Sequence, residues 1–102
     1  MKLHYDTDQH ELLVLLDGEL DHHRSAMLRN EIDTAVYTHM PTVLILDFRD
    51  VTFMDSSGIG LIIGRYEIIQ SMCGEIRIQN PSAYIGRVLR LAGMERILGE
   101  IT

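Results

Sequence analysis

A buried strand that leads into a helix is predicted by VLILDF-RDVTFMD-SSGIG, residues 43–60. The run Val43–Phe48 is apolar except for Asp47, which is typical of a parallel strand covered on both faces. We expect Arg49–Asp55 to form a polar turn and the helix to begin at Ser56. The start of a helix carries unpaired backbone N–H groups and partial positive charge, so it can hold an anion such as phosphate. A serine at this point is therefore a candidate for more than capping.

Two short strands and a helix are predicted before this stretch. Apolar residues cluster at Leu3–Tyr5 and at Leu12–Leu16, and the polar connector between them suits an antiparallel hairpin. Apolar residues then recur at helical spacing from Leu28 to Met40. This first helix should end before Pro41, since proline cannot continue a helix.

The helix that begins at Ser56 is expected to end near Cys73. Apolar residues repeat at helical spacing from Ile59 to Ile69, and Gly74 easily adopts the left-handed conformation that ends helices. The lone Cys73 rules out an internal disulfide, and we expect it to fill the core.

One more strand and one more helix complete the predicted order of elements. Glu75–Gln79 alternates with a period of two, and Asn80-Pro81-Ser82 supplies a turn and a helix cap. The helix that follows should bury Ile85–Ala92 along one face and end at Gly93, with the tail Met94–Ile101 packing back. This order predicts an α/β fold with a mixed β-sheet of four to five strands and helices packed against it.

Length and charge narrow the classes of function. A chain of 102 residues suits one domain, residues 1–102. Its net charge is −6 and Lys2 is its only lysine, which disfavours nucleic acid as a partner and favours a basic protein. The first residues lack the apolar stretch of a signal peptide, and no run is long enough to span a membrane. We therefore expect a cytoplasmic protein without a membrane segment.

No catalytic, metal or cofactor site is predicted. A nucleophile elbow of the G-x-S-x-G type needs glycine at position 55, where this chain has Asp55. The five histidines form no H-x-x-x-H pair, and one cysteine cannot build a multi-cysteine zinc site. The glycines at 58, 60 and 64 miss the dinucleotide fingerprint by one residue, and we expect Gly60 and Gly64 to serve close packing.

The segment Asp55-Ser56-Ser57-Gly58 allows two explanations. Aspartate and serine are ordinary N-cap residues, so capping alone accounts for all four residues. The alternative is phosphorylation of one serine, with Ser57 favoured because its phosphate would lie near the amides of Gly58 and Ile59. A phosphate adds about −1.5 to −2 charge at neutral pH, and its main effect would be to repel a partner.

Three motifs together give this chain a resemblance to STAS domains, and among them to anti-sigma factor antagonists of the sporulation type. The first is GELDHH at 18–23, and the second is LILDF at 44–48. The most specific part is FMDSSGIG at 53–60 followed by GRY at 64–66. The resemblance runs over almost the whole chain.

The resemblance implies a regulator rather than an enzyme. In this family the antagonist binds an anti-sigma factor that is also a serine kinase and so releases the sigma factor. Carried to this sequence, it implies Ser57 as the phosphate acceptor, with Asp55, Ser56 and Gly58 beside it on the partner-binding surface. Asp21 corresponds to the aspartate after the second strand, and the loop 18–21 should lie next to the serine. A serine phosphatase acting on the phosphorylated form would restore binding.

Two other functions stay open from the sequence. One is a STAS regulator or scaffold of a general stress-response signalling complex, which would use a similar serine motif. The other, less favoured, is a nucleotide-binding protein that uses the start of the helix at Ser57 as a phosphate site.

Overall fold

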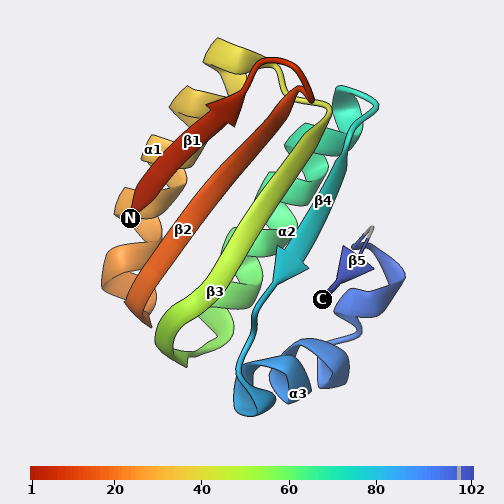
Figure 1. Cartoon of the computed structure of the whole chain (residues 1–102). Helices are drawn as coiled ribbons and strands as arrows, with labels where there is room; N and C mark the ends of the chain where they lie inside the picture. The colour runs from red at the N-terminus through yellow and green to blue at the C-terminus, as the bar shows by residue number, and fades with distance from the viewer. Residues whose placement is uncertain (99) are drawn as a thin grey trace.

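In the computed structural model, five strands form one mixed sheet in the order β1-β2-β3-β4-β5 (Figure 1). The structure describes residues 1–98 and 100–102. β1 and β2 pair antiparallel, and each later pair of neighbours is parallel. The strands are β1 (Lys2–Asp6), β2 (Glu11–Leu20), β3 (Val43–Met54), β4 (Glu75–Gln79) and β5 (Glu100–Ile101).

Each parallel crossover in the sheet contains a helix. α1 (His22–His39) joins β2 to β3, α2 (Ser56–Ser71) joins β3 to β4, and α3 (Ala83–Leu91) leads toward β5. A short 3₁₀ turn, η1 (Met94–Arg96), follows α3. Figure 1 shows α1 and α2 side by side behind the sheet, while α3 lies near the lower end of β4. The predicted α/β fold with helices packed against a mixed sheet is confirmed.

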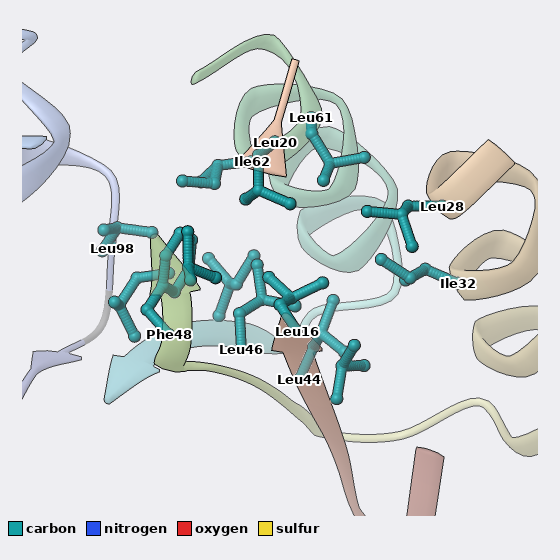
Figure 2. Packing of buried hydrophobic residues seen from close by; sticks show 14 of the residues in the cluster. Leu16, Leu20, Leu28, Ile32, Leu44, Leu46, Phe48, Leu61, Ile62 and Leu98 are labelled. Atoms are coloured by element: carbon teal, nitrogen blue, oxygen red, sulfur yellow. The ribbon is translucent and has the colours of Figure 1, made fainter. Parts of the chain in front are cut away.

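The core lies between the sheet and the helices α1 and α2 (Figure 2). Alternate residues of β2 and β3 face these helices, because successive side chains of a strand point to opposite faces. Each such leucine or isoleucine, once fully buried, stabilises the fold by about 1.5–3 kcal/mol. The buried side chains labelled in Figure 2 are Leu16, Leu20, Leu28, Ile32, Leu44, Leu46, Phe48, Leu61, Ile62 and Leu98.

β3 extends six residues beyond the predicted end at Phe48 and reaches Met54, so the expectation of a polar turn over 49–55 is wrong. β2 is also longer than predicted and continues to Leu20, and it offers β3 a pairing partner along this length. The register shifts twice there, and the buried side chains of Val51 and Met54 anchor the extension. The polar residues Arg49, Asp50 and Thr52 hid this part of the strand, because they do not alternate with apolar residues at a period of two.

In the turn between α2 and β4, the roles of Cys73 and Gly74 differ from the prediction. Cys73, not Gly74, adopts the left-handed conformation, with φ of 60°, and the cysteine is exposed rather than part of the core. Gly74 allows its backbone to lie close to that of Thr42, because a Cβ at position 74 would lie 2.7 Å from the carbonyl oxygen of Thr42. By contrast, Gly93 is left-handed after α3, with φ of 76°, as predicted.

The tail after α3 packs back on the domain as expected. Met94 and Leu98 are buried in the core. Ile101 pairs with Ile78 of β4, and the amide of Thr102 donates to the carbonyl of Ile78 at 2.8 Å. Gly99, within the predicted tail, lies outside the described residues.

Candidate functional site

Two aspartates mark the edge of the sheet at which α1 and α2 begin. Leu20 and Met54, the last residues of β2 and β3, are direct partners in the parallel register. Asp21 and Asp55 follow them, so both carboxylates lie at the carboxyl end of adjacent strands. This edge, at the lower end of β2 and β3 in Figure 1, is where α/β sheets place their functional loops.

Asp21 is the N-cap of α1. Its Oδ1 accepts a hydrogen bond of 3.0 Å from the amide of Arg24, and its carbonyl accepts from the amide of Ser25. The Asp21 side chain is half-buried. An N-cap of this kind stabilises a helix by about 1 kcal/mol, so Asp21 has a structural role whether or not a partner contacts it.

Asp55, rather than a serine, caps α2. Its Oδ1 accepts from the amide of Ser57 at 2.8 Å, and its carbonyl accepts from the amide of Gly58 at 3.0 Å. Within residues 1–98 and 100–102, neither Ser56 nor Ser57 uses its hydroxyl in a hydrogen bond to the protein. Ser56 is exposed and Ser57 is half-buried. The capping explanation therefore accounts for Asp55 but leaves both serine hydroxyls without a structural task.

Gly58 holds the start of α2 against the ends of the two strands. A Cβ on this residue would lie 2.2 Å from Cγ and 2.6 Å from Sδ of Met54, and 3.5 Å from Cβ of Leu20. Met54 and Leu20 are buried, so they have little room to move away. Glycine is thus what allows the helix to begin so close to the paired strand ends.

The other two glycines of α2 do not have the packing role that we predicted. A Cβ on Gly60 or Gly64 would meet no atom within 4 Å. The two glycines are four residues apart and lie on the same side of α2. Because glycine has no side chain, the helix backbone is uncovered there. The expectation of close packing is wrong for this pair, since the space around each is open.

A groove of about 210 Å³ lies beside Ser57, between the first turns of α1 and α2. Ser57 and Gly60 line it from α2, and Arg29 lines it from α1. The full lining is His22, Ser25, Ala26, Arg29, Ser57, Gly60 and Leu61. The four α1 residues of this lining are not predicted as a group. Their spacing along α1 is three, one and three residues, which places them on one helical face.

The segment before Asp21 is the end of β2, not the loop that we expected over 18–21. Gly18 has φ of 68° at an irregular point in the pairing with β3. The guanidinium of Arg24 donates to the backbone carbonyls of Asp17 and Glu19, and its Nη2 lies 3.0 Å from the carboxylate of Asp17. Arg24, which the sequence did not reveal, thus fixes the backbone that leads to Asp21.

A buried ion pair joins α1 and α2 further along both helices than the groove. Nε of Arg65 lies 2.7 Å from Oδ1 of Asp33, and the contact is Coulombic because the two groups are not aligned as a hydrogen bond. Arg65 is 5% exposed, and its burial lowers the pKa of the guanidinium below the ordinary value. The pair fixes the separation of the two helices that form the groove walls.

Asp47 anchors the neighbouring loop between β4 and α3. It is 4% exposed and accepts hydrogen bonds from the amide of Arg49 and from the side chains of Gln79 and Asn80, at 2.8, 2.9 and 3.0 Å. Burial raises the pKa of Asp47, but these three hydrogen bonds lower it further than burial raises it, and the pKa lies below its ordinary value. The carboxylate is therefore held in its charged form.

The predicted site residues Asp21, Asp55, Ser56, Ser57 and Gly58 all lie where α1 and α2 begin. Among the residues that the structure describes, no group of three His, Cys, Asp or Glu side chains could hold a metal ion. Of the helices in this part of the chain, none has the length and apolar character needed to cross a bilayer.

The sequence matches a family model and known relatives over nearly its full length. A STAS domain model matches residues 2–102. An anti-sigma F factor antagonist of Paenibacillus polymyxa is 36% identical over 100 residues, which cover 96% of this chain and 86% of that protein. An anti-sigma-B factor antagonist of Bacillus subtilis is 25% identical over 100 residues, which cover 96% of this chain and 90% of the relative.

Solved structures with the same fold include SpoIIAA in its unphosphorylated and in its phosphorylated form. The anti-sigma factor antagonist SpoIIAA in its unphosphorylated form superposes with a TM-score of 0.84 at 33% identity, covering 99% of this chain and 87% of the other. The Bacillus cell fate determinant SpoIIAA in its phosphorylated form gives a TM-score of 0.75 at 33% identity, covering 99% and 90%.

Proposed function

The chain belongs to the STAS family and is an anti-sigma factor antagonist of the SpoIIAA type, and we propose that its unphosphorylated form binds an anti-sigma factor through the edge where α1 and α2 begin. Binding would displace the sigma factor that the anti-sigma factor holds. The proposed contact surface consists of Asp21, Asp55, Ser56, Ser57 and Gly58. The setting we propose is control of sporulation in the cytoplasm.

The observation that carries this proposal is the free hydroxyl of Ser57. Asp55 performs the capping of α2, so the Ser57 side chain lies in the first turn with no hydrogen bond to the protein among the described residues. It is half-buried at the groove and therefore accessible from one side only. A hydroxyl with this freedom can accept a phosphoryl group without loss of an interaction that holds the helix.

The chemistry of modification belongs to the partner in this proposal. The anti-sigma factor acts as a serine kinase that supplies ATP, magnesium and the base. Oγ of Ser57 forms a bond to the γ-phosphorus, ADP leaves, and the hydroxyl proton passes to the base of the kinase. A serine phosphatase then hydrolyses the phosphoserine and restores the binding form. This chain is the substrate and the switch.

Phosphorylation ends binding in this scheme chiefly through charge. The phosphate adds about −1.5 to −2 charge next to the carboxylates of Asp21 and Asp55. The hydroxyl of Ser57 is free to donate a hydrogen bond to an acceptor of the partner, and the phosphate would replace this donor with a dianion that repels that acceptor. The bare backbone at Gly60 and Gly64 lets such a partner approach α2 closely, which supports a contact surface on this side of the helix.

Incubation with the cognate anti-sigma kinase and ATP, followed by mapping of phosphate by mass spectrometry, tests the site. We expect one phosphate, on Ser57. Ser57→Ala should abolish incorporation, and Ser56→Ala is the matched control because it removes the adjacent, more exposed hydroxyl. Phosphate on Ser56 or elsewhere in the Ser57→Ala variant would overturn the assignment.

A stress-response role is the second candidate, favoured by the similarity to the anti-sigma-B factor antagonist of Bacillus subtilis. The same surface and the same serine would then serve a different anti-sigma factor. Pull-down of purified chain with anti-sigma F and anti-sigma-B factors in parallel distinguishes the two, and the sporulation proposal expects retention of the anti-sigma F factor alone.

A further inference from the structure

We propose that the groove between α1 and α2 binds the phosphate of phosphorylated Ser57, with Arg29 as the cation that holds it. This inference rests on the proposed function, in which Ser57 is the acceptor. The ligand is a phosphomonoester dianion carried by the chain itself. The phosphorylated form would thus have a fixed phosphate beside α1 instead of a freely rotating one.

The amides of Ser57 and Gly58 at the start of α2 already have acceptors, so a phosphate on Ser57 needs other donors. Asp55 accepts from the amide of Ser57 through its carboxylate and from the amide of Gly58 through its carbonyl. A phosphate directed toward these amides would also meet the negative charge of the Asp55 carboxylate. The groove is the direction that avoids this repulsion.

The α1 wall of the groove offers hydrogen-bond donors. Ser25 lines the groove, is 9% exposed, and its Oγ has no hydrogen-bond partner within the part of the chain that the structure describes. A buried hydroxyl without a partner is unfavourable, and an acceptor in the groove would relieve it. Arg29 follows one turn later on the same face and carries five N–H donors that suit phosphate geometry.

Two arginines on facing helices interact electrostatically next to the groove, although the chain as a whole carries −6. Arg65 is paired with Asp33 across the two helices, and no carboxylate pairs with Arg29 among the described residues. Burial lowers the pKa of Arg65 most, and the charge of Asp33 raises it. The positive charge of Arg29 lowers it further, which shows that the two guanidinium groups interact. Asp33 therefore balances one of the two guanidinium groups, and an additional anion would balance the other.

The groove also has room for the phosphate. Its volume is about 210 Å³, and the α2 wall is open because Gly60 has no side chain. Glycine within a helix is less stable than alanine, and no packing contact at Gly60 requires it. A larger residue at this position would fill the space next to Ser57.

A phosphorus NMR titration of the chain with phosphoserine incorporated at position 57 tests the inference directly. The second pKa of phosphoserine is about 6 when unperturbed, and a neighbouring guanidinium lowers it by favouring the dianion. We expect this pKa to rise by about half a pH unit in Arg29→Gln. Gly60→Leu, which retains the arginine but fills the groove, should raise it in the same direction.

The matched control is Arg87→Gln, which removes one positive charge from an exposed position on α3. All variants keep His22, which lines the groove. Circular dichroism of each variant establishes that the fold is retained. The inference is overturned if Arg29→Gln changes the phosphoserine pKa no more than Arg87→Gln does.

This experiment separates the inference from the proposed function. The phosphoserine is introduced during synthesis, so no kinase is needed. A lowered pKa that depends on Arg29 supports the groove even if the kinase modifies another residue. An unperturbed pKa overturns the groove even if the kinase modifies Ser57.

Discussion

Asp21 and Asp55 cap two neighbouring helices from equivalent positions, each one residue beyond the paired strand ends Leu20 and Met54. The parallel register therefore brings together two carboxylates that lie 34 positions apart in the chain. Each carboxylate is needed by its own helix, and together they give the edge beside Ser57 a negative charge. Structural and functional roles overlap at these two residues, and substitutions have to be chosen to separate them.

Asp21→Asn separates the cap from the charge. Asparagine is as good an N-cap as aspartate, so we expect the free energy of unfolding to change by less than about 0.5 kcal/mol. Asp21→Ala removes the cap and should cost about 1 kcal/mol. Urea unfolding measures both. If the carboxylate contacts the anti-sigma factor, both variants should bind it more weakly, whereas binding by Asp21→Asn at the original affinity would assign Asp21 to capping alone.

Gly58→Ala and Gly60→Ala form a matched pair within one helix. The new methyl at 58 would overlap buried Met54, so we expect destabilisation by about 1–3 kcal/mol. The methyl at 60 meets no atom within 4 Å, and there we expect stabilisation by about 0.4–1 kcal/mol. Thermal or urea unfolding measures both. Equal effects of the two substitutions would contradict the packing described for the start of α2.

The contrast between these glycines shows what the sequence could and could not reveal. Their spacing was visible in the sequence, but the space around each depends on side chains that are distant in the chain. Gly58 lies against Leu20 and Met54, while Gly60 faces an open groove. A pattern of glycines predicts that backbone is exposed on one face, and only the tertiary structure shows whether another element covers that face.

Element types were predicted better than element ends. The continuous apolar run of Val43–Phe48 and the alternation of Glu75–Gln79 predict both strands, because buried strands leave a strong local signal. The extension of β3 to Met54 depends on pairing with β2. The two strands are distant in the sequence, so no local pattern indicates this pairing. The helix start at Ser56 was predicted because its signal is local, whereas the groove with Arg29 needs two helices to be placed side by side.

Asp47 should make stability depend on pH in the acidic range. Its pKa is lower in the folded protein than the ordinary value of about 3.9, so it contributes stability above that value and loses it as pH falls through the folded pKa. Asp47→Asn should cost about 1–3 kcal/mol at pH 7, because an amide cannot accept all three hydrogen bonds. Urea unfolding at a series of pH values measures this.

The difference between the original chain and Asp47→Asn should be largest at neutral pH and shrink below about pH 4. Asp8→Asn is a suitable control, since Asp8 is an exposed aspartate in the turn between β1 and β2. A constant difference between the original chain and Asp47→Asn from pH 7 to pH 3 would show that charge at Asp47 contributes nothing.

The most direct test of the central claim is the dissociation constant for the cognate anti-sigma factor, measured with unmodified chain and with chain carrying phosphoserine at position 57. We expect phosphorylation to weaken binding about tenfold or more, which corresponds to about 1.4 kcal/mol or more. Ser57→Ala should bind like the unmodified chain. Equal affinity of the phosphorylated and unmodified forms would contradict the proposal that phosphate on Ser57 switches the partner off.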